Sequence, residues 1–188
     1  MSWPSDQRDK TRLQILESAA RLFALQGYSR VSIDDLMASA GLTRGAFYNH
    51  FRTKSEVYNE AIRHAFEAGR AQLGKLGIDG LSALVDGYLQ RSHTAAESMR
   101  CPLAFMATDV TRREREVRHV YGTALQSFVG RLEVSLEAPP AESRQRALQM
   151  AVALIGGVAL ARAVDNLEFS EEILAACRAG CHELLAAT

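Results

Sequence analysis

The chain has 188 residues, 47% of them hydrophobic and 23% charged, so it is long enough to bury a substantial apolar core. Its 22 Lys and Arg balance 22 Asp and Glu, which argues against a uniformly basic nucleic-acid coat. Three cysteines with no CxxC motif or Cys/His metal spacing argue against a zinc site and a disulfide scaffold, and there is no run of 18 apolar residues to predict a membrane span.

The charge is unevenly distributed along the chain. Residues 1–54 carry eight Lys and Arg against five Asp and Glu, whereas residues 55–188 carry fourteen against seventeen. This small N-terminal excess weakly supports a nucleic-acid contact there. The first six residues lack the charged and then apolar pattern of a signal peptide. We therefore expect a cytoplasmic protein with reduced thiols, no cofactor and no metal.

Apolar residues at helical spacing predict a first helix over residues 11–26, ended by Gly27. Arg8, Lys10 and Arg12 precede or enter this helix. They suit contacts to DNA phosphates, and a solvated basic helix end explains them equally well.

Two short helices hinged at one glycine follow in residues 32–51. Ser32 is placed to cap the first of them, and Gly41 ends it, because glycine adopts the left-handed conformation needed just past a helix end. Thr43 then begins a second helix. Two short capped helices joined by a glycine-containing turn predict a helix-turn-helix, whose second helix can lie in the DNA major groove.

The second of these helices is expected to span seven or eight residues and to have two faces. Phe47 and Phe51 are four residues apart and should face the core. Arg44 suits a guanine edge and Asn49 an adenine edge. The other candidates for contact with DNA are of three kinds. Gly45 would let a backbone or a base approach closely, and Tyr48, His50 and Lys54 suit phosphate. Ser32 and Thr43 are the two capping residues.

A longer helix follows, with Thr53 as its predicted cap and Glu56 completing a capping box. The stretch from Gly41 to Lys54, with its Phe-Tyr pair and His50-Phe51, resembles the DNA-binding domain of the TetR family of transcriptional regulators. The likeness covers about residues 9–66. Ala46 departs from the threonine often found at that position, and the missing hydroxyl removes one possible DNA contact.

The resemblance implies an all-α protein with two domains. Residues 1–52 would form the helix-turn-helix DNA-binding domain, and residues 53–188 a helical ligand-binding and dimerisation domain. By this likeness Thr43, Arg44, Tyr48, Asn49, His50 and Lys54 face DNA. The implied partners are palindromic operator DNA, a small-molecule effector and a second copy of the chain, with no membrane.

Beyond this stretch only periodicity guides the interpretation. Glycines 74, 77 and 80 predict a loop, and apolar spacing predicts helices over residues 81–98, 103–110, 112–137, 141–166 and 170–187. The last two present apolar stripes that favour self-association as a four-helix bundle, although they would also serve as the core of a monomer. The predicted dimer-interface residues are Gly156, Gly157, Leu160, Ile173, Cys177, Cys181 and Leu184.

The central helices hold the candidate effector pocket, because they combine apolar and aromatic side chains with a few polar groups. Its predicted lining is Tyr88, His93, Met99, Phe105, Met106, Tyr121 and Phe128. Each residue alone is more typical of a core than of a ligand contact. Cys101 offers an alternative, a thiol that senses electrophiles or oxidants beside a helix start, although a small buried residue is the commoner role of such a cysteine.

These patterns favour a ligand-responsive repressor over two other classes. An enzyme would need a base, an oxyanion site or a metal beside His93 or Cys101, and the sequence shows none of these. A helical adaptor that binds protein instead of DNA would lack salt-dependent retention on DNA.

Overall fold

The computed structural model describes residues 5–73, 78–90, 102–136 and 138–186, which form nine helices and no strand. This confirms the all-α prediction. The helices are α1 (Ser5–Gln26), α2 (Ile33–Ser39), α3 (Arg44–Phe47), α4 (Lys54–Leu73), α5 (Ile78–Tyr88), α7 (Pro102–Val110), α8 (Arg115–Val134), α9 (Pro140–Ala163) and α10 (Leu167–Ala186).

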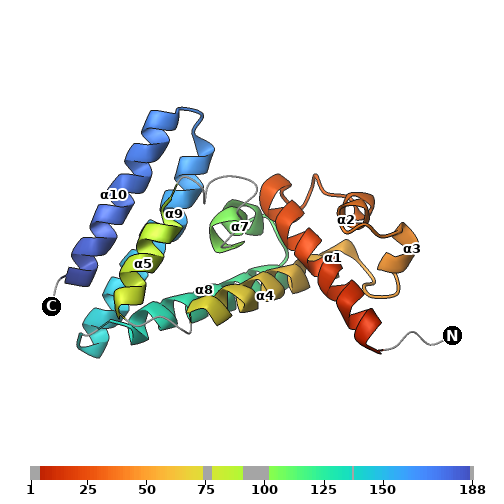
Figure 1. Ribbon diagram of the computed structural model, residues 1–188, viewed down its shortest axis with the longest axis horizontal. Coiled ribbons are helices and arrows are strands. Elements are labelled where there is room, and N and C mark those ends of the chain that lie inside the picture. The colour runs from red at the N-terminus through yellow and green to blue at the C-terminus, as the bar shows by residue number, and fades with distance from the viewer. Residues whose placement is uncertain (1–4, 74–77, 91–101, 137, 187–188) are drawn as a thin grey trace.

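The two ends of the described chain lie at opposite ends of the molecule (Figure 1). Helices α1, α2 and α3 gather at the N-terminal end, and α9 and α10 lie side by side at the other. Between them, α4 and α8 run alongside each other, and α7 contacts α1, α4, α8 and α9. Helix α7 therefore joins the two ends.

Two apolar cores account for this arrangement. The N-terminal core contains Phe23, Leu36, Phe47, Phe51 and Tyr58, and it extends to residues of α7 and α8. The second core is built from α5, α7, α8, α9 and α10. The first half of α4 belongs to the N-terminal core, although it follows the predicted domain boundary. The boundary between residues 52 and 53 stays a prediction.

Helix α9 is long and apolar enough to span a membrane by length and composition alone. In the structure it packs against α5, α7, α8 and α10, and Ala147, Met150 and Leu154 on it are fully buried. This agrees with the expectation from its sequence, since a helix that is apolar nearly all round packs against several neighbours. Core packing therefore accounts for the buried part of this apolar helix.

At the N-terminal end, the prediction that the first helix starts at residue 11 was wrong, because α1 begins at Ser5. The added turns are polar and have no apolar period to reveal them. Their residues are good helix formers or capping types, and the Thr11 hydroxyl donates to the Gln7 carbonyl (2.9 Å). These turns carry Arg8 alongside the end of the helix-turn-helix.

Several predicted boundaries in the C-terminal half also needed correction. Helix α5 includes Gly80, which was expected in a loop, and it ends at Tyr88; residues 91–98 of the predicted helix lie outside the described residues. Helix α8 starts three residues late, because Arg112 and Arg113 close the turn that ends α7. Helix α10 starts early because the Asn166 side chain accepts from the Phe169 amide (2.9 Å) and caps it.

Candidate nucleic-acid interface

The start of α2 and the turn after it have the predicted geometry. The Asp35 amide donates to Ser32 Oγ (3.1 Å), and the Asp35 carboxylate accepts from the Ser32 amide (2.8 Å), so the pair forms a capping box. The hydrogen bond from the Ser32 hydroxyl lowers the pKa of Asp35. Gly41 has φ +67°, as expected for the residue that turns the chain after α2. These contacts fix the orientation of α3 relative to α2.

Helix α3 is shorter than the predicted seven or eight residues, with α-helical geometry only over Arg44–Phe47. The Asn49 and His50 amides donate to carbonyls three residues back, on Ala46 and Phe47, which tightens the last turn. Thr43 holds the N-cap position without a side-chain capping bond. The helix-turn-helix is therefore compact, and it continues through a turn to Phe51.

The two faces of this segment are those that the sequence predicted. Phe47 and Phe51 are almost fully buried, with ring centroids 5.8 Å apart. The opposite face is exposed and carries Thr43, Arg44, Gly45, Tyr48 and Asn49. Five of the eight predicted DNA-contact residues therefore share one surface, with Ser32 exposed at the start of α2.

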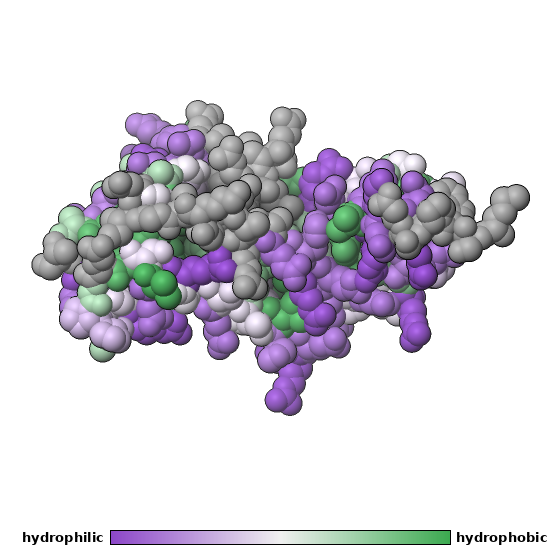
Figure 2. All heavy atoms as spheres, turned by 60° about the horizontal axis from the view of Figure 1, so that its bottom comes forward, coloured by the Kyte–Doolittle hydropathy of each residue, from purple (hydrophilic) through white to green (hydrophobic). Residues whose placement is uncertain are grey.

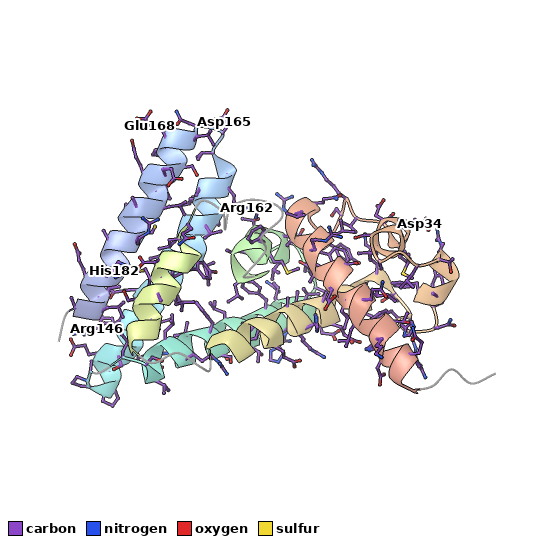
Figure 3. All side chains as sticks on the ribbon, in the orientation of Figure 1. Asp34, Arg146, Arg162, Asp165, Glu168 and His182 are labelled. Carbon is purple, nitrogen blue, oxygen red and sulfur yellow. The ribbon has the colours of Figure 1, made fainter. Side chains whose placement is uncertain are left out.

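Arg44 is held by the helix that precedes it. Its guanidinium donates to Asp34 Oδ2 at 2.6 Å, and both side chains are about 60% exposed. Asp34 is labelled on α2 in Figure 3. A hydrogen bond with Tyr48 and the charge of Asp34 raise the pKa of Arg44. An exposed ion pair of this kind stabilises little, so Arg44 can exchange Asp34 for another acceptor at small cost.

Two arginines of α1 hold the end of the recognition segment. Arg8 donates to the Asn49 carbonyl (3.4 Å) and Arg12 to the His50 carbonyl (3.2 Å). Arg12 also pairs with Glu60 of α4, and its guanidinium lies 4.4 Å from the Phe51 ring centroid. These contacts leave the Asn49 side chain exposed while they fix its backbone.

The Lys54 ammonium is turned inward in the structure. It donates to the carbonyls of Tyr28 (2.9 Å) and Val31 (3.0 Å) and lies 4.1 Å from the Tyr28 ring centroid. Partial burial, with the charge of Arg113, lowers its pKa. In this arrangement Lys54 holds the loop between α1 and α2, and its predicted phosphate contact would require the ammonium to leave both carbonyls.

The predicted pocket residues divide between the two cores. Tyr88 and Phe128 stack with centroids 6.4 Å apart, and the Tyr121 hydroxyl donates to the Leu103 carbonyl (2.8 Å). Phe105 belongs to the same C-terminal core, Met106 is fully buried in the N-terminal core, and Tyr121 packs against both cores. Adjacent residues of α7 point to opposite sides of that helix. His93 and Met99 lie outside the described residues.

Two of the predicted dimer-interface residues are covered within the protomer itself. Cys181 is fully buried in the C-terminal core, and a Cβ atom on Gly157 of α9 would lie 2.9 Å from Cys177 Sγ of α10. Leu160 is exposed, and Gly156 faces open space. Periodicity identifies the apolar stripe of a helix but not the partner that covers it. Ile173, Cys177 and Leu184 are partly buried against the C-terminal core.

The sequence interpretation missed two exposed apolar residues on α9. Val152 is 71% exposed and Leu148, four residues before it, is 44% exposed, and Leu160 continues this exposed row two turns further along the helix. Their spacing at positions 148, 152 and 160 was the available signal, but an all-apolar helix hides which stripe remains uncovered. Burial raises the pKa of the Cys177 thiol and raises that of Cys181 to about 11. Cys101 lies outside the described residues.

Comparison with known families supports the sequence resemblance. Residues 15–61 match the sequence model described as bacterial regulatory proteins, TetR family. The transcriptional regulator AcrR of Shigella flexneri is 37% identical over 73 residues, which are 39% of this chain and 32% of that protein. TtgR of Pseudomonas putida is 42% identical over 52 residues, 28% of this chain and 25% of that protein. The matches therefore span about a third or less of these curated relatives.

Solved structures extend the likeness in fold to the whole chain. A TetR transcriptional regulator from Legionella pneumophila matches with a TM-score of 0.77 and 19% identity over 98% of both chains. A TetR-family regulator from Cytophaga hutchinsonii matches with a TM-score of 0.76 and 19% identity over 100% of both. At this identity the similarity concerns the fold.

Proposed function

Because this chain belongs to the TetR family of bacterial regulatory proteins, we propose that it is a cytoplasmic DNA-binding transcriptional regulator, and specifically a repressor. The observation that carries this proposal is the two-faced segment from Thr43 to Phe51. Its aromatic side is buried in the N-terminal core, and its polar side is exposed. A helix-turn-helix of this design binds in the major groove.

The exposed side chains suit distinct parts of a DNA duplex. Arg44 has the paired donors that bind a guanine edge, and Asn49 has the donor and acceptor that bind adenine. Thr43, Tyr48 and the start of α2 at Ser32 suit phosphate oxygens. The surface over the N-terminal helices, on the right of Figure 2, is mostly hydrophilic with small apolar patches, as a nucleic-acid contact requires. Arg44 would release Asp34 on binding.

The first test is Arg44→Ala, assayed by titrating protein into operator and scrambled duplexes at several salt concentrations. Loss of a bidentate guanine contact should cost about 1–3 kcal/mol at one operator position and leave scrambled DNA less affected. Arg118→Ala, an exposed arginine on α8, is the matched control. Equal losses on both duplexes would remove the base-reading role of Arg44.

We further propose that the repressor is a homodimer that uses α9 and α10 to bind a palindromic operator. This is supported by the exposed apolar stripe of Leu148, Val152 and Leu160, beside the partly buried residues of α10. Burying such a stripe against its copy removes apolar surface from water. Two recognition segments would then be held about one helical turn of DNA apart, roughly 34–36 Å.

Val152→Glu tests this interface, because it places two charges at the proposed contact without entering the protomer core. We expect sedimentation to show monomers and operator affinity to fall, while the unfolding of the isolated protomer is little changed. Gln126→Glu, at an exposed position on α8 away from α9 and α10, provides a control. An intact Val152→Glu dimer would place the interface elsewhere.

Release from DNA is proposed to follow binding of a small apolar effector among the central helices, near Tyr88, Tyr121 and Phe128. The ligand would favour a conformation in which α4 no longer holds the recognition segments at the operator spacing. The alternative trigger is covalent reaction of Cys101. A screen of apolar and electrophilic compounds on wild type and Cys101→Ser separates the two, since loss of every response in Cys101→Ser would exclude the apolar effector.

A further inference from the structure

A cleft of about 430 Å³ lies where the C-terminal ends of α1 and α9 meet α7. Its apolar wall includes Leu25, Phe105 and Ala159, and its polar groups include Asp109, Arg112 and Arg162. Of the predicted pocket residues that the structure describes, only Phe105 borders this cleft. The volume falls in the usual range for small-molecule sites. The cleft is therefore a second candidate for ligand binding.

Arg162 is the unusual group in this cleft. Figure 3 labels it on α9, near α7, and its guanidinium carbon lies 3.8 Å from the Phe105 ring centroid. Within the described residues it makes no hydrogen bond or ion pair, although it is half-buried. Partial burial lowers its pKa. By contrast, Arg12, Arg44 and Arg113 each pair with a carboxylate.

Removing a cation from water without giving it a counter-ion costs free energy, so a half-buried arginine is normally paired. The one acidic side chain among the described lining residues, Asp109, is already bound elsewhere. Its carboxylate accepts from the Tyr58 hydroxyl (2.6 Å) and the Tyr28 amide (3.4 Å) and lies 3.9 Å from the Arg113 guanidinium. Arg112 adds a second, exposed cation to the lining. The cleft therefore offers positive charge to an anion from solution.

We propose that this cleft binds a small organic carboxylate with an aromatic or other apolar body, and that Arg162 binds the carboxylate. A guanidinium donates two parallel hydrogen bonds to a carboxylate, and stacking on Phe105 fixes the plane of that guanidinium. The wall formed by Leu25, Ala104 and Ala159 accepts the apolar body. An uncharged ligand of the same shape would leave Arg162 without its counter-ion.

The position of the cleft connects this site to the proposed repressor. The lining includes Gly27 at the end of α1 and Asp109, whose carboxylate holds Tyr28 and Tyr58 in the N-terminal core. A bound carboxylate would lie beside both contacts. Its effect on operator binding rests on the proposed function, whereas its binding to the cleft does not.

Binding is tested on the full chain with benzoate and 2-naphthoate, using benzamide as the neutral analogue. The Nε–H resonance of Arg162 is assigned by its loss in Arg162→Gln and followed in ¹H–¹⁵N spectra. We expect saturable shifts with both carboxylates and an affinity for benzamide at least about tenfold lower, because charge-assisted hydrogen bonds are lost. An unmoved Arg162 resonance, or equal shifts with benzamide, would overturn the proposal.

Variants then separate the role of Arg162 from a structural one. By calorimetry, Arg162→Gln should weaken carboxylate binding roughly 10- to 150-fold. Arg162→Lys should fall between wild type and Gln, because it keeps the charge and loses the fork geometry. The exposed Arg118→Gln should bind as wild type does. Circular dichroism melts identify any variant that fails to fold, and a folded Arg162→Gln protein with unchanged affinity contradicts the proposal.

The regulatory arm uses operator DNA. If 2-naphthoate lowers operator affinity in wild type but not in Arg162→Gln, the cleft is an effector site. If the carboxylate binds and operator affinity is unchanged, the binding site stands and its regulatory role is rejected. A chain that binds no DNA would reject the proposed function, while the resonance and calorimetry still decide whether the cleft binds anions.

Discussion

The helix-turn-helix and the α9–α10 pair are held in place by different forces. Around α2 and α3, side chains of α1 bond to the backbone: Gln14 donates to the Ala40 carbonyl at 2.7 Å, and Arg12 donates to the His50 carbonyl. Between α9 and α10 the contact is mainly apolar, with Leu154, Val158 and Leu174 fully buried. One hydrogen bond, from Ser170 Oγ to the Ala161 carbonyl (3.0 Å), lies where the two helices join.

Helix length explains the contrast. Helices α2 and α3 have seven and four residues and bury little apolar surface each, so they need polar contacts with longer neighbours to keep a fixed orientation. Helices α9 and α10 have 24 and 20 residues, and their packed faces are large enough to fix each other. The N-terminal end should therefore be sensitive to lost hydrogen bonds, and the C-terminal pair to changes in side-chain volume.

The largest effect is expected when side-chain volume is added between α9 and α10. Gly157→Ala would place a methyl group 2.9 Å from Cys177 Sγ and 3.1 Å from Leu89 Cδ2, which forces those side chains to shift. We expect chemical denaturation to show a loss of about 1–3 kcal/mol in the free energy of unfolding.

Gly122→Ala in α8 is the matched control, because its added Cβ meets no atom within 4 Å. Alanine favours helix over glycine, so this variant should gain up to about 1 kcal/mol. If Gly157→Ala also gained stability, α9 and α10 would be packed more loosely than the structure indicates.

The next prediction tests a polar contact of the N-terminal core. Tyr58 is fully buried, and its hydroxyl donates to Asp109 on α7. Tyr58→Phe keeps the ring packed and removes only this bond, so we expect a loss of roughly 1.5 kcal/mol in unfolding free energy. Tyr48→Phe removes an exposed hydroxyl and should change stability by less than about 0.5 kcal/mol. Equal effects would mean that the bond to Asp109 contributes nothing measurable.

The sequence predicted features of the helix-turn-helix that depend on neighbouring residues better than features that depend on distant ones. The cap at Ser32, the left-handed Gly41 and the buried Phe47 and Phe51 were predictable, because each depends on residues close in sequence. The inward position of Lys54 was not predictable, since its acceptors lie more than twenty residues away.

The C-terminal errors have another cause. A stripe of apolar residues does not say whether a second helix of the same chain or a second chain covers it, so Gly157 and Leu160 could not be told apart by period. The cleft around Arg162 was missed because its lining comes from three distant segments of the chain. An arginine that follows a long apolar run, with no acidic residue within four positions before it, was the available signal.

The smallest expected effect is a pH dependence of stability caused by His50, which lies beside the arginines that hold the recognition segment. His50 is half-buried, and its Nδ1 is buried and has no hydrogen-bond partner among the described residues. Burial, together with the positive charges of Arg8 and Arg12, lowers its pKa below that of histidine in an unfolded chain, about 6.5. Between the two pKa values the unfolded chain therefore binds more protons than the folded protein, and stability falls as the pH falls through this window.

Urea midpoints measured at pH 7.5 and pH 5.5 should show a larger loss of stability for wild type than for His50→Gln, in which residue 50 cannot titrate. His119→Gln, at an exposed position on α8, should lose as much as wild type does. A His50→Gln protein with the full wild-type loss would show that the arginines of α1 hold the recognition segment without penalising the charged form of His50.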